Sequence, residues 1–236
     1  MIGYGPARRP HPYPTRPGHA SRHGQRLSGL ARERVRFAAV LGPVLEWTLL
    51  SPLVGAEPAE VLAALGEAAD ARLLHPAATG FRFPHALIRD VVRAAMLPPE
   101  RAAAAAQALT IVRSAHPDLE PPGDEVAVDV ALLAGDDLAA ARVLLAAGRR
   151  SLSRGALGTA EATLGRAAEL STPDRLLAAA VDEALAEVLA FAGKTDAAAA
   201  TSTRLINRLD QQADAGRIGR GAPGWPACVQ RPVTGP

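Results

Sequence analysis

Five consecutive alanines, at positions 102–106, lie in a segment from 100 to 115 that contains neither Gly nor Pro. Alanine has the highest helix propensity of all residues, so this segment is predicted to be helical. Aromatic residues make up 3% of the chain while 48% of it is hydrophobic, so Ala, Leu and Val must build its core. These residues suit closely packed helices, whereas strands favour aromatic and β-branched residues. The first prediction is therefore a mostly α fold.

Residues 30–97 have the element order of a small winged-helix module. One helix is expected from about residue 30 to Gly42-Pro43, a second from about 46 to 53 with Trp47 as its large anchor, and a third from Pro58, a residue favoured at the first helical position. The pairs Leu73-Leu74 and Phe81–Phe83 bracket a Pro- and Gly-containing turn and predict a β-hairpin. Three helices followed by a two-stranded wing define the module, and this order alone does not decide its role.

Residues 98–210 contain only helical patterns. After 100–115 they run approximately over 124–134, 137–153, 156–170, 174–192 and 196–209. Aligning Gly155 with Gly193 gives a period of 38 residues, which is typical of a tetratricopeptide-like α-helical array. A plain antiparallel bundle of Ala-rich helices remains the alternative.

The segment Phe81–Arg93 reads as a short strand that feeds directly into a helix. From Pro84 onward, apolar residues recur on one helical face, beginning with Leu87 and Ile88. His85 and Arg89 lie one turn apart at the start of this helix, beside free backbone N–H groups, where they could meet a phosphate. Alternatively, His85 is an ordinary helix-start residue satisfied by a nearby carbonyl group.

The sequence FRFPHALIRDVV in this segment resembles the F-R-F-x-H-x-L-h-R-[ED] motif of bacterial LuxR-type transcriptional regulators of the STAND class, which are AAA-like signal-transduction ATPases. The resemblance covers roughly residues 30 to 210 and is diffuse outside the motif. It implies a winged helix that closes over a nucleotide domain and a tetratricopeptide-like sensor region. It also implies that His85 contacts the phosphates of bound ADP in the inactive state, with Arg89 as a less certain neighbour.

Charge is unevenly distributed along the chain. Residues 1–36 contain eight Arg and one acidic residue, whereas residues 37–210 contain fifteen Lys and Arg against twenty-two acidic residues. The outer positions of the third helix are also acidic, so we expect no direct DNA binding by this chain. Residues 1–29, a basic arm, and 211–236, a Gly- and Pro-containing tail, are expected to be disordered.

No catalytic arrangement is apparent in the sequence. The phosphate loop G-x-x-x-x-G-K-[ST] is absent, and Gly193-Lys194-Thr195 lacks its upstream glycine. Adjacent acids, such as Asp182-Glu183, are expected on helix starts or surfaces, and the single Cys, Cys228, has no metal-ligating neighbours. We expect no enzyme activity, no metal and no cofactor in this chain, although the resemblance implies ATP or ADP for the full-length family.

These observations predict a non-catalytic fragment of a signal-responsive regulator. It would relay between a nucleotide-binding domain, which this sequence lacks, and a helical sensor region that binds a protein or peptide. The alternative is a free-standing helical-repeat adaptor. With one Cys and neither an apolar run of about 20 residues nor a signal peptide, the chain is expected in the cytoplasm and away from membranes.

Overall fold

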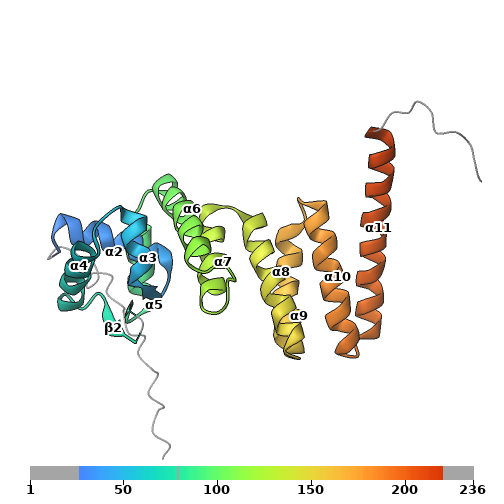
Figure 1. The fold of residues 1–236 in the computed structure, drawn as a ribbon, viewed down its shortest axis with the longest axis horizontal. Coiled ribbons are helices and arrows are strands. Elements are labelled where there is room, and N and C mark those ends of the chain that lie inside the picture. Colours follow the sequence, from blue (N-terminus) through green and yellow to red (C-terminus); the bar gives the residue numbers. More distant parts are fainter. Residues whose placement is uncertain (1–26, 79, 220–236) are drawn as a thin grey trace, which may run out of the picture. The chain divides into compact units, whose positions relative to one another are not determined.

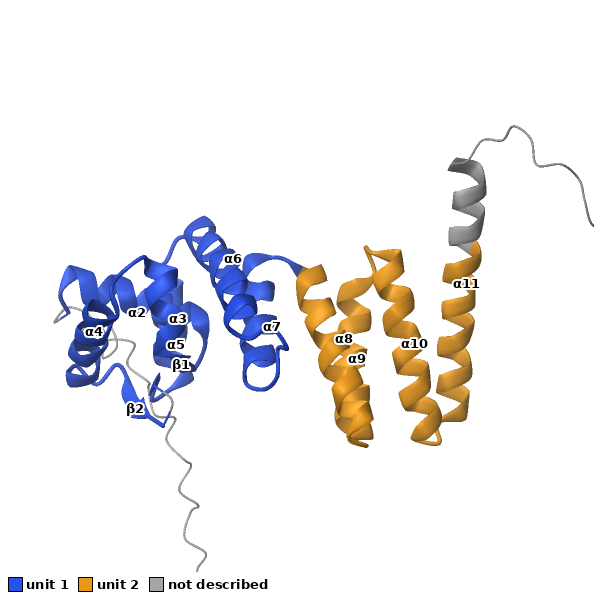
Figure 2. Ribbon diagram, in the orientation of Figure 1, with its two compact units in different colours: residues 1–136 blue, residues 137–236 orange. Residues whose placement is uncertain are grey.

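The computed structural model describes residues 27–78 and 80–219. These residues form ten helices and one three-stranded antiparallel sheet, so the mostly α prediction is confirmed (Figure 1). The chain divides into two compact units, residues 1–136 and 137–236 (Figure 2). The arm predicted over 1–29 lies outside the described residues up to position 26, and the described part begins with buried Leu27.

The first unit contains six described helices and the sheet. The helices are α2 (Gly29–Leu41), α3 (Trp47–Val54), α4 (Pro58–Asp70), α5 (Ala86–Ala94), α6 (Pro98–Ala115) and α7 (Gly123–Ala134). The strands are β1 (Val44–Glu46), β2 (His75–Ala77) and β3 (Gly80–Arg82), in the order β1-β3-β2. The predicted hairpin therefore exists, but its first strand follows Leu73-Leu74 instead of including it, because both leucines are buried in the core.

The sheet includes a strand that the sequence did not predict. β1 pairs with β3, placing Leu45 opposite Phe81 and Glu46 opposite Gly80. Gly80 has a φ of +151°, and a Cβ there would lie 2.2 Å from the carbonyl oxygen of Leu45. Only glycine allows β3 to approach β1 this closely.

The helix starts follow elementary capping rules. Ser28 precedes α2, and its hydroxyl accepts a hydrogen bond from the amide of Ala31 at 3.1 Å. The same hydroxyl donates to Glu67 of α4 at 2.8 Å, and the backbone N–H of Ser28 donates to the other oxygen of that carboxylate. These bonds, the backbone one first, lower the pKa of Glu67. They join the start of α2 to the end of α4.

Leucine and valine side chains fill the core of the first unit. The largest fully buried ones in this unit are Leu41, Leu45, Leu50, Leu65, Leu74, Val40, Val61, Val112 and Val130. Trp47 was expected to anchor the second helix, but it is half-buried at the first position of α3. The buried side chains of that helix are the smaller ones of Leu49, Leu50 and Leu53.

Helix α5 differs from the prediction in two respects. It begins at Ala86 with His85 as its N-cap residue, so Pro84 precedes the helix instead of occupying its first turn. None of its residues is buried, although its apolar residues recur at helical spacing. Leu87 is 64% exposed and Val91 is 38% exposed. The helix therefore presents apolar side chains on the surface of the first unit.

Helices α6 and α7 belong to the first unit, whereas the sequence analysis ended the winged-helix module at residue 97. The reason is packing: α6 lies against α2 and α3, α7 lies against α2, and the two helices pack on one another. The side chain of Glu100 accepts a hydrogen bond from the amide of Leu97 at 3.3 Å, which fixes the start of α6.

The second unit consists of α8 (Asp137–Ser153), α9 (Leu157–Ser171), α10 (Arg175–Phe191) and α11 (Thr195–Gly219). The first and third of these helices begin 38 residues apart, as do the second and fourth, in agreement with the predicted period. Gly155 and Gly193 end the equivalent helices with φ near +74° and +71°. Helix α11 continues through Gly219, so the disordered tail predicted from residue 211 begins too early in the prediction. The reason is that Gln and Ala, which favour helix, are frequent after residue 210. Residues 220–236 lie outside the described part.

Within the described residues, no single helix has the length and apolar character needed to cross a membrane. The pair α3 and α4 passes that test only when taken together, and the two helices are bent by 116° at their junction.

Candidate functional site

His85 lies at the N-cap of α5 with an exposed side chain. Its backbone is extended, with φ −140° and ψ 138°, and its imidazole makes no capping hydrogen bond to the helix. Its carbonyl oxygen accepts a hydrogen bond from the amide of Ile88 at 3.0 Å. The alternative, in which the imidazole is paired with a nearby carbonyl group, involves a different contact from a helix cap and stays a prediction.

Arg89, one turn later, faces the interior of the unit. Its side chain is 12% exposed, and its Nε–H donates to the carbonyl oxygen of Ala39 in α2 at 3.1 Å. One terminal nitrogen lies 4.0 Å from the carboxylate of Asp129 in α7. Burial lowers the pKa of Arg89, and the charge of Arg93 adds to this effect, while Asp129 and Asp90 oppose it. Arg89 thus joins α5 to α2 and α7, while His85 remains exposed.

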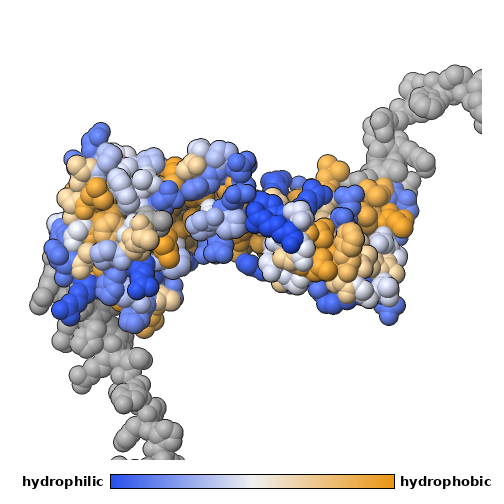
Figure 3. Space-filling view, turned by 60° about the horizontal axis from the view of Figure 1, so that its bottom comes forward, coloured by the Kyte–Doolittle hydropathy of each residue, from blue (hydrophilic) through white to orange (hydrophobic). Residues whose placement is uncertain are grey.

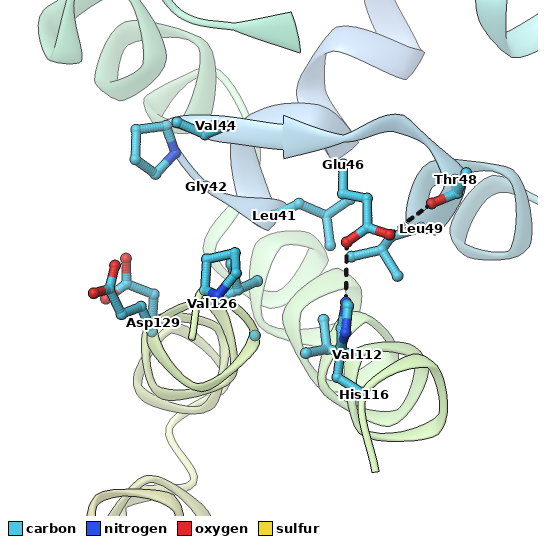
Figure 4. A pocket seen from close by; sticks show the side chains of 14 residues that line it. Leu41, Gly42, Val44, Glu46, Thr48, Leu49, Val112, His116, Val126 and Asp129 are labelled. Carbon is cyan, nitrogen blue, oxygen red and sulfur yellow. Dashed lines mark hydrogen bonds and ion pairs between the residues drawn. The ribbon is translucent and has the colours of Figure 1, made fainter. Parts of the chain in front are cut away.

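The first unit also contains a cavity of about 490 Å³ that the sequence analysis did not predict. Its walls come from the end of α2 with β1 and the start of α3, from the end of α6, and from the start of α7 (Figure 4). The lining residues are Leu41, Gly42, Pro43, Val44, Glu46, Thr48, Leu49, Val112, His116, Pro122, Gly123, Glu125, Val126 and Asp129.

A chain of polar contacts crosses one wall of this cavity. Oε2 of Glu46 lies 3.0 Å from Nε2 of His116, and the hydroxyl of Thr48 donates to Oε1 of Glu46 at 3.0 Å (Figure 4). The carboxylate lies between the hydroxyl and the imidazole. In a nucleophilic triad the imidazole occupies the middle, where it takes the proton from the hydroxyl. This order therefore does not activate Thr48 as a nucleophile.

Two carboxylates line the α7 side of the cavity. Glu125 and Asp129 are one helical turn apart and are both exposed. Their spacing could have been read from the sequence, but nothing local indicates that residues 41–49 lie opposite them. Within the described ranges, no group of three or more His, Cys, Asp or Glu residues could hold a metal ion. Cys228 lies outside those ranges.

Asp182 of α10 corrects a sequence expectation in the second unit. It was expected on a helix surface beside Glu183, but its side chain is only 3% exposed. Arg204 and Arg208 of α11 donate to its two oxygens at 3.0 and 2.9 Å. Because the two arginines are four residues apart on α11, both reach the same carboxylate, and the cluster holds α10 against α11.

Neither a family model, nor a curated protein, nor a solved structure matches this chain.

Proposed function

We propose that this chain is the non-catalytic regulatory part of a signal-responsive, ATPase-type transcriptional regulator of the LuxR and STAND kind. In this proposal the first unit contacts a nucleotide-binding domain through α5. The second unit is a tetratricopeptide-like sensor that binds a protein or peptide. The motif FRFPHALIRDVV carries the family resemblance, and the exposed state of α5 is the observation that supports it best.

The surface of α5 suits contact with another protein domain. Leu87 and Val91 are one turn apart and exposed, while Arg89 between them fixes the helix to α2. Exposed apolar side chains are common on proteins, and the view in Figure 3 shows apolar surface on each unit. An amphipathic helix with no buried residue is less ordinary, because the apolar face of a surface helix normally packs on its own core. A domain that covers Leu87 and Val91 would complete this arrangement.

His85 lies where such a domain would meet α5. An imidazole N–H can donate a hydrogen bond to a phosphate oxygen, and the first amide groups of a helix have no partner within the helix. These groups fit one contact to ADP or ATP and do not constitute a nucleotide site. The nucleotide would therefore be held chiefly by the partner domain, and His85 would report its presence.

The same proposal assigns no DNA contact to the first unit. Helix α4, the equivalent of a recognition helix, has exposed Glu60 and Asp70, while Glu67 is bonded to Ser28. Carboxylates repel phosphates, and phosphate neutralisation supplies most non-specific DNA affinity. A cytoplasmic location is part of the proposal, because a transcriptional regulator acts there.

A free-standing helical-repeat adaptor is the second candidate. The 38-residue spacing of the helices in the second unit favours it, since repeated helix pairs form surfaces that bind peptides. In this case α5 would have no nucleotide-binding partner.

The flanking genomic DNA separates the candidates, and an ATPase assay tests the absence of catalysis that both of them imply. The flanking genomic DNA, read in all frames, should encode a phosphate loop upstream and a helix-turn-helix downstream if the regulator proposal is right. The purified chain should show no ATP hydrolysis. Measurable hydrolysis would contradict the proposal, and flanking genes unrelated to regulators would favour the adaptor.

A further inference from the structure

The cavity between β1, α6 and α7 has the size of a small-molecule site. Ligand pockets typically have volumes of roughly 300–1,000 Å³ and apolar walls with a few polar groups. The cavity of about 490 Å³ lies in this range. No residue of α5 lines the cavity, so a ligand in it would be independent of the contact proposed for α5.

The interior of the cavity is apolar. Leu41, Leu49 and Val112 line it and are each at most 5% exposed, so their side chains are held by the core. Val126 is half-buried and Val44 is exposed, so these two valines face both the cavity and solvent. Filling this space with a hydrocarbon body would remove apolar surface from water.

The ionisable groups of the lining are predominantly acidic. They are three carboxylates, from Glu46, Glu125 and Asp129, and one imidazole, from His116. Glu46 is bonded to His116 and Thr48, and Asp129 lies 4.0 Å from Arg89. The carboxylate of Glu125 is exposed at the cavity edge, one turn from Asp129, and neither Lys nor Arg is among the lining residues. A negative edge beside an apolar interior favours a ligand with an apolar body and a positive charge.

We propose that this cavity binds an apolar small molecule that carries one cationic nitrogen. The hydrocarbon part lies against Leu41, Leu49 and Val112, and the nitrogen lies between Glu125 and Asp129. Glu46 and His116 form the opposite wall. Binding at this place bridges α7 and β1 and stabilises the packing of α6 and α7 on the rest of the first unit.

Three rigid probes with the same hydrocarbon cage test the proposal. The intact chain is titrated at neutral pH with 1-aminoadamantane, 1-adamantanol and adamantane-1-carboxylate, and binding is followed by calorimetry and by methyl NMR shifts of Leu49, Val112 and Val126. The amine is expected to bind about fivefold more tightly than the alcohol, and the carboxylate least. Added salt should weaken binding of the amine alone. Equal or tighter binding of the carboxylate would overturn the proposed charge preference.

Substitutions of residues in the cavity wall test whether the probes bind in this cavity. Glu125→Gln should lower the affinity for the amine about fivefold and leave that for the alcohol unchanged. Glu187→Gln, at an exposed position of α10, is the matched control and should change neither. Val126→Trp should abolish binding of both probes by filling the cavity from a half-buried position, and thermal melts verify that this variant folds. Unchanged binding in Val126→Trp, or no binding of any probe to the unmodified chain, would overturn the site itself. An effect of Glu187→Gln equal to that of Glu125→Gln would show non-specific attraction and would also overturn it.

Discussion

Oε2 of Glu46 lies 3.0 Å from Nε2 of His116, so that one contact joins the end of β1 to the residue that follows α6. Both side chains are partly exposed, at 40% and 30%, and solvent therefore weakens their attraction. A double-mutant cycle with Glu46→Gln and His116→Ala, followed by urea unfolding, should give a coupling free energy below about 1 kcal/mol. A coupling of several kcal/mol would show that the pair supports the first unit far more than its exposure suggests.

The cluster of Asp182, Arg204 and Arg208 should contribute more to the stability of the chain than the pair of Glu46 and His116 does. Asp182→Ala leaves two arginines without their buried partner, and breaking a buried ion pair costs about 3–5 kcal/mol. We expect the lower end of this range, because Arg204 and Arg208 can reach water. Urea unfolding and amide exchange in α11 measure the effect. Glu183→Ala is the matched control: its exposed pair with Arg149, at 3.6 Å, should contribute less than about 1 kcal/mol. Equal effects of the two substitutions would argue against the burial of Asp182.

Gly148 of α8 lies directly against the side chain of Leu164 of α9. A Cβ at position 148 would lie 2.5 Å from Cγ of Leu164, so Gly148→Ala should destabilise the second unit by about 1–3 kcal/mol through overpacking. Gly165→Ala, in α9, has open space and should be neutral or stabilising by up to about 1 kcal/mol. Thermal melts compare the two variants. A loss of stability in Gly165→Ala alone would contradict the described helix crossing.

Asp174 should make the second unit sensitive to acid. Its carboxylate accepts hydrogen bonds from the amides of Leu177 and Leu176. The bond from Leu177 is the main cause of a pKa below the ordinary 3.8, and the ion pair with Arg142 also lowers the pKa. Because the folded-state pKa is lowered, the stabilisation is present above pH 3.8 and is lost as the pH falls through the folded-state value. Asp174→Asn keeps the cap but cannot titrate. In urea unfolding measured at a series of pH values, the variant should lose less stability than the original chain below this pH. Parallel pH profiles would contradict this role.

The sequence predicted most helix boundaries because glycine and proline mark them. Pro58 begins α4, and Gly155 and Gly193 end α8 and α10, as expected from their conformational preferences. The 38-residue period followed from the same two glycines. The apolar spacing of α5 was also visible, but periodicity cannot say whether an apolar face is covered. Leu87 belongs to the predicted apolar face, yet it is 64% exposed.

The features that were missed depend on distant parts of the chain. β1 has three residues, too few for an alternating pattern, and it exists because β3 pairs with it. Glu46 and His116 are 70 positions apart, so no local motif links them. Asp182 was predicted at the surface because Glu183 is next to it in the sequence. Its arginine partners lie one helix later, so the local sequence does not show them. His85 and Arg89 were both predicted as site residues, but the local sequence could not show that Arg89 bonds to Ala39 of α2 while His85 stays exposed.

The stability of the isolated chain should be insensitive to His85. His85→Ala removes an exposed imidazole that makes no capping bond, so thermal melts should change little. Leu65→Ala, which truncates a fully buried side chain in α4, should cost about 2–5 kcal/mol and serves as the core reference. Leu87→Ala should resemble His85→Ala, because Leu87 is exposed.

The rate of ADP release from a regulator of the proposed kind tests the central claim most directly. In a protein that carries these residues beside a nucleotide-binding domain, His85→Ala should accelerate ADP release about tenfold, because it removes one hydrogen bond to a charged group. His75→Ala, an exposed histidine of β2 in the same unit, is the matched control and should leave the rate unchanged. ADP release that is unaffected by His85→Ala would contradict the account, and a loss of stability equal to that of Leu65→Ala would assign His85 a structural role instead.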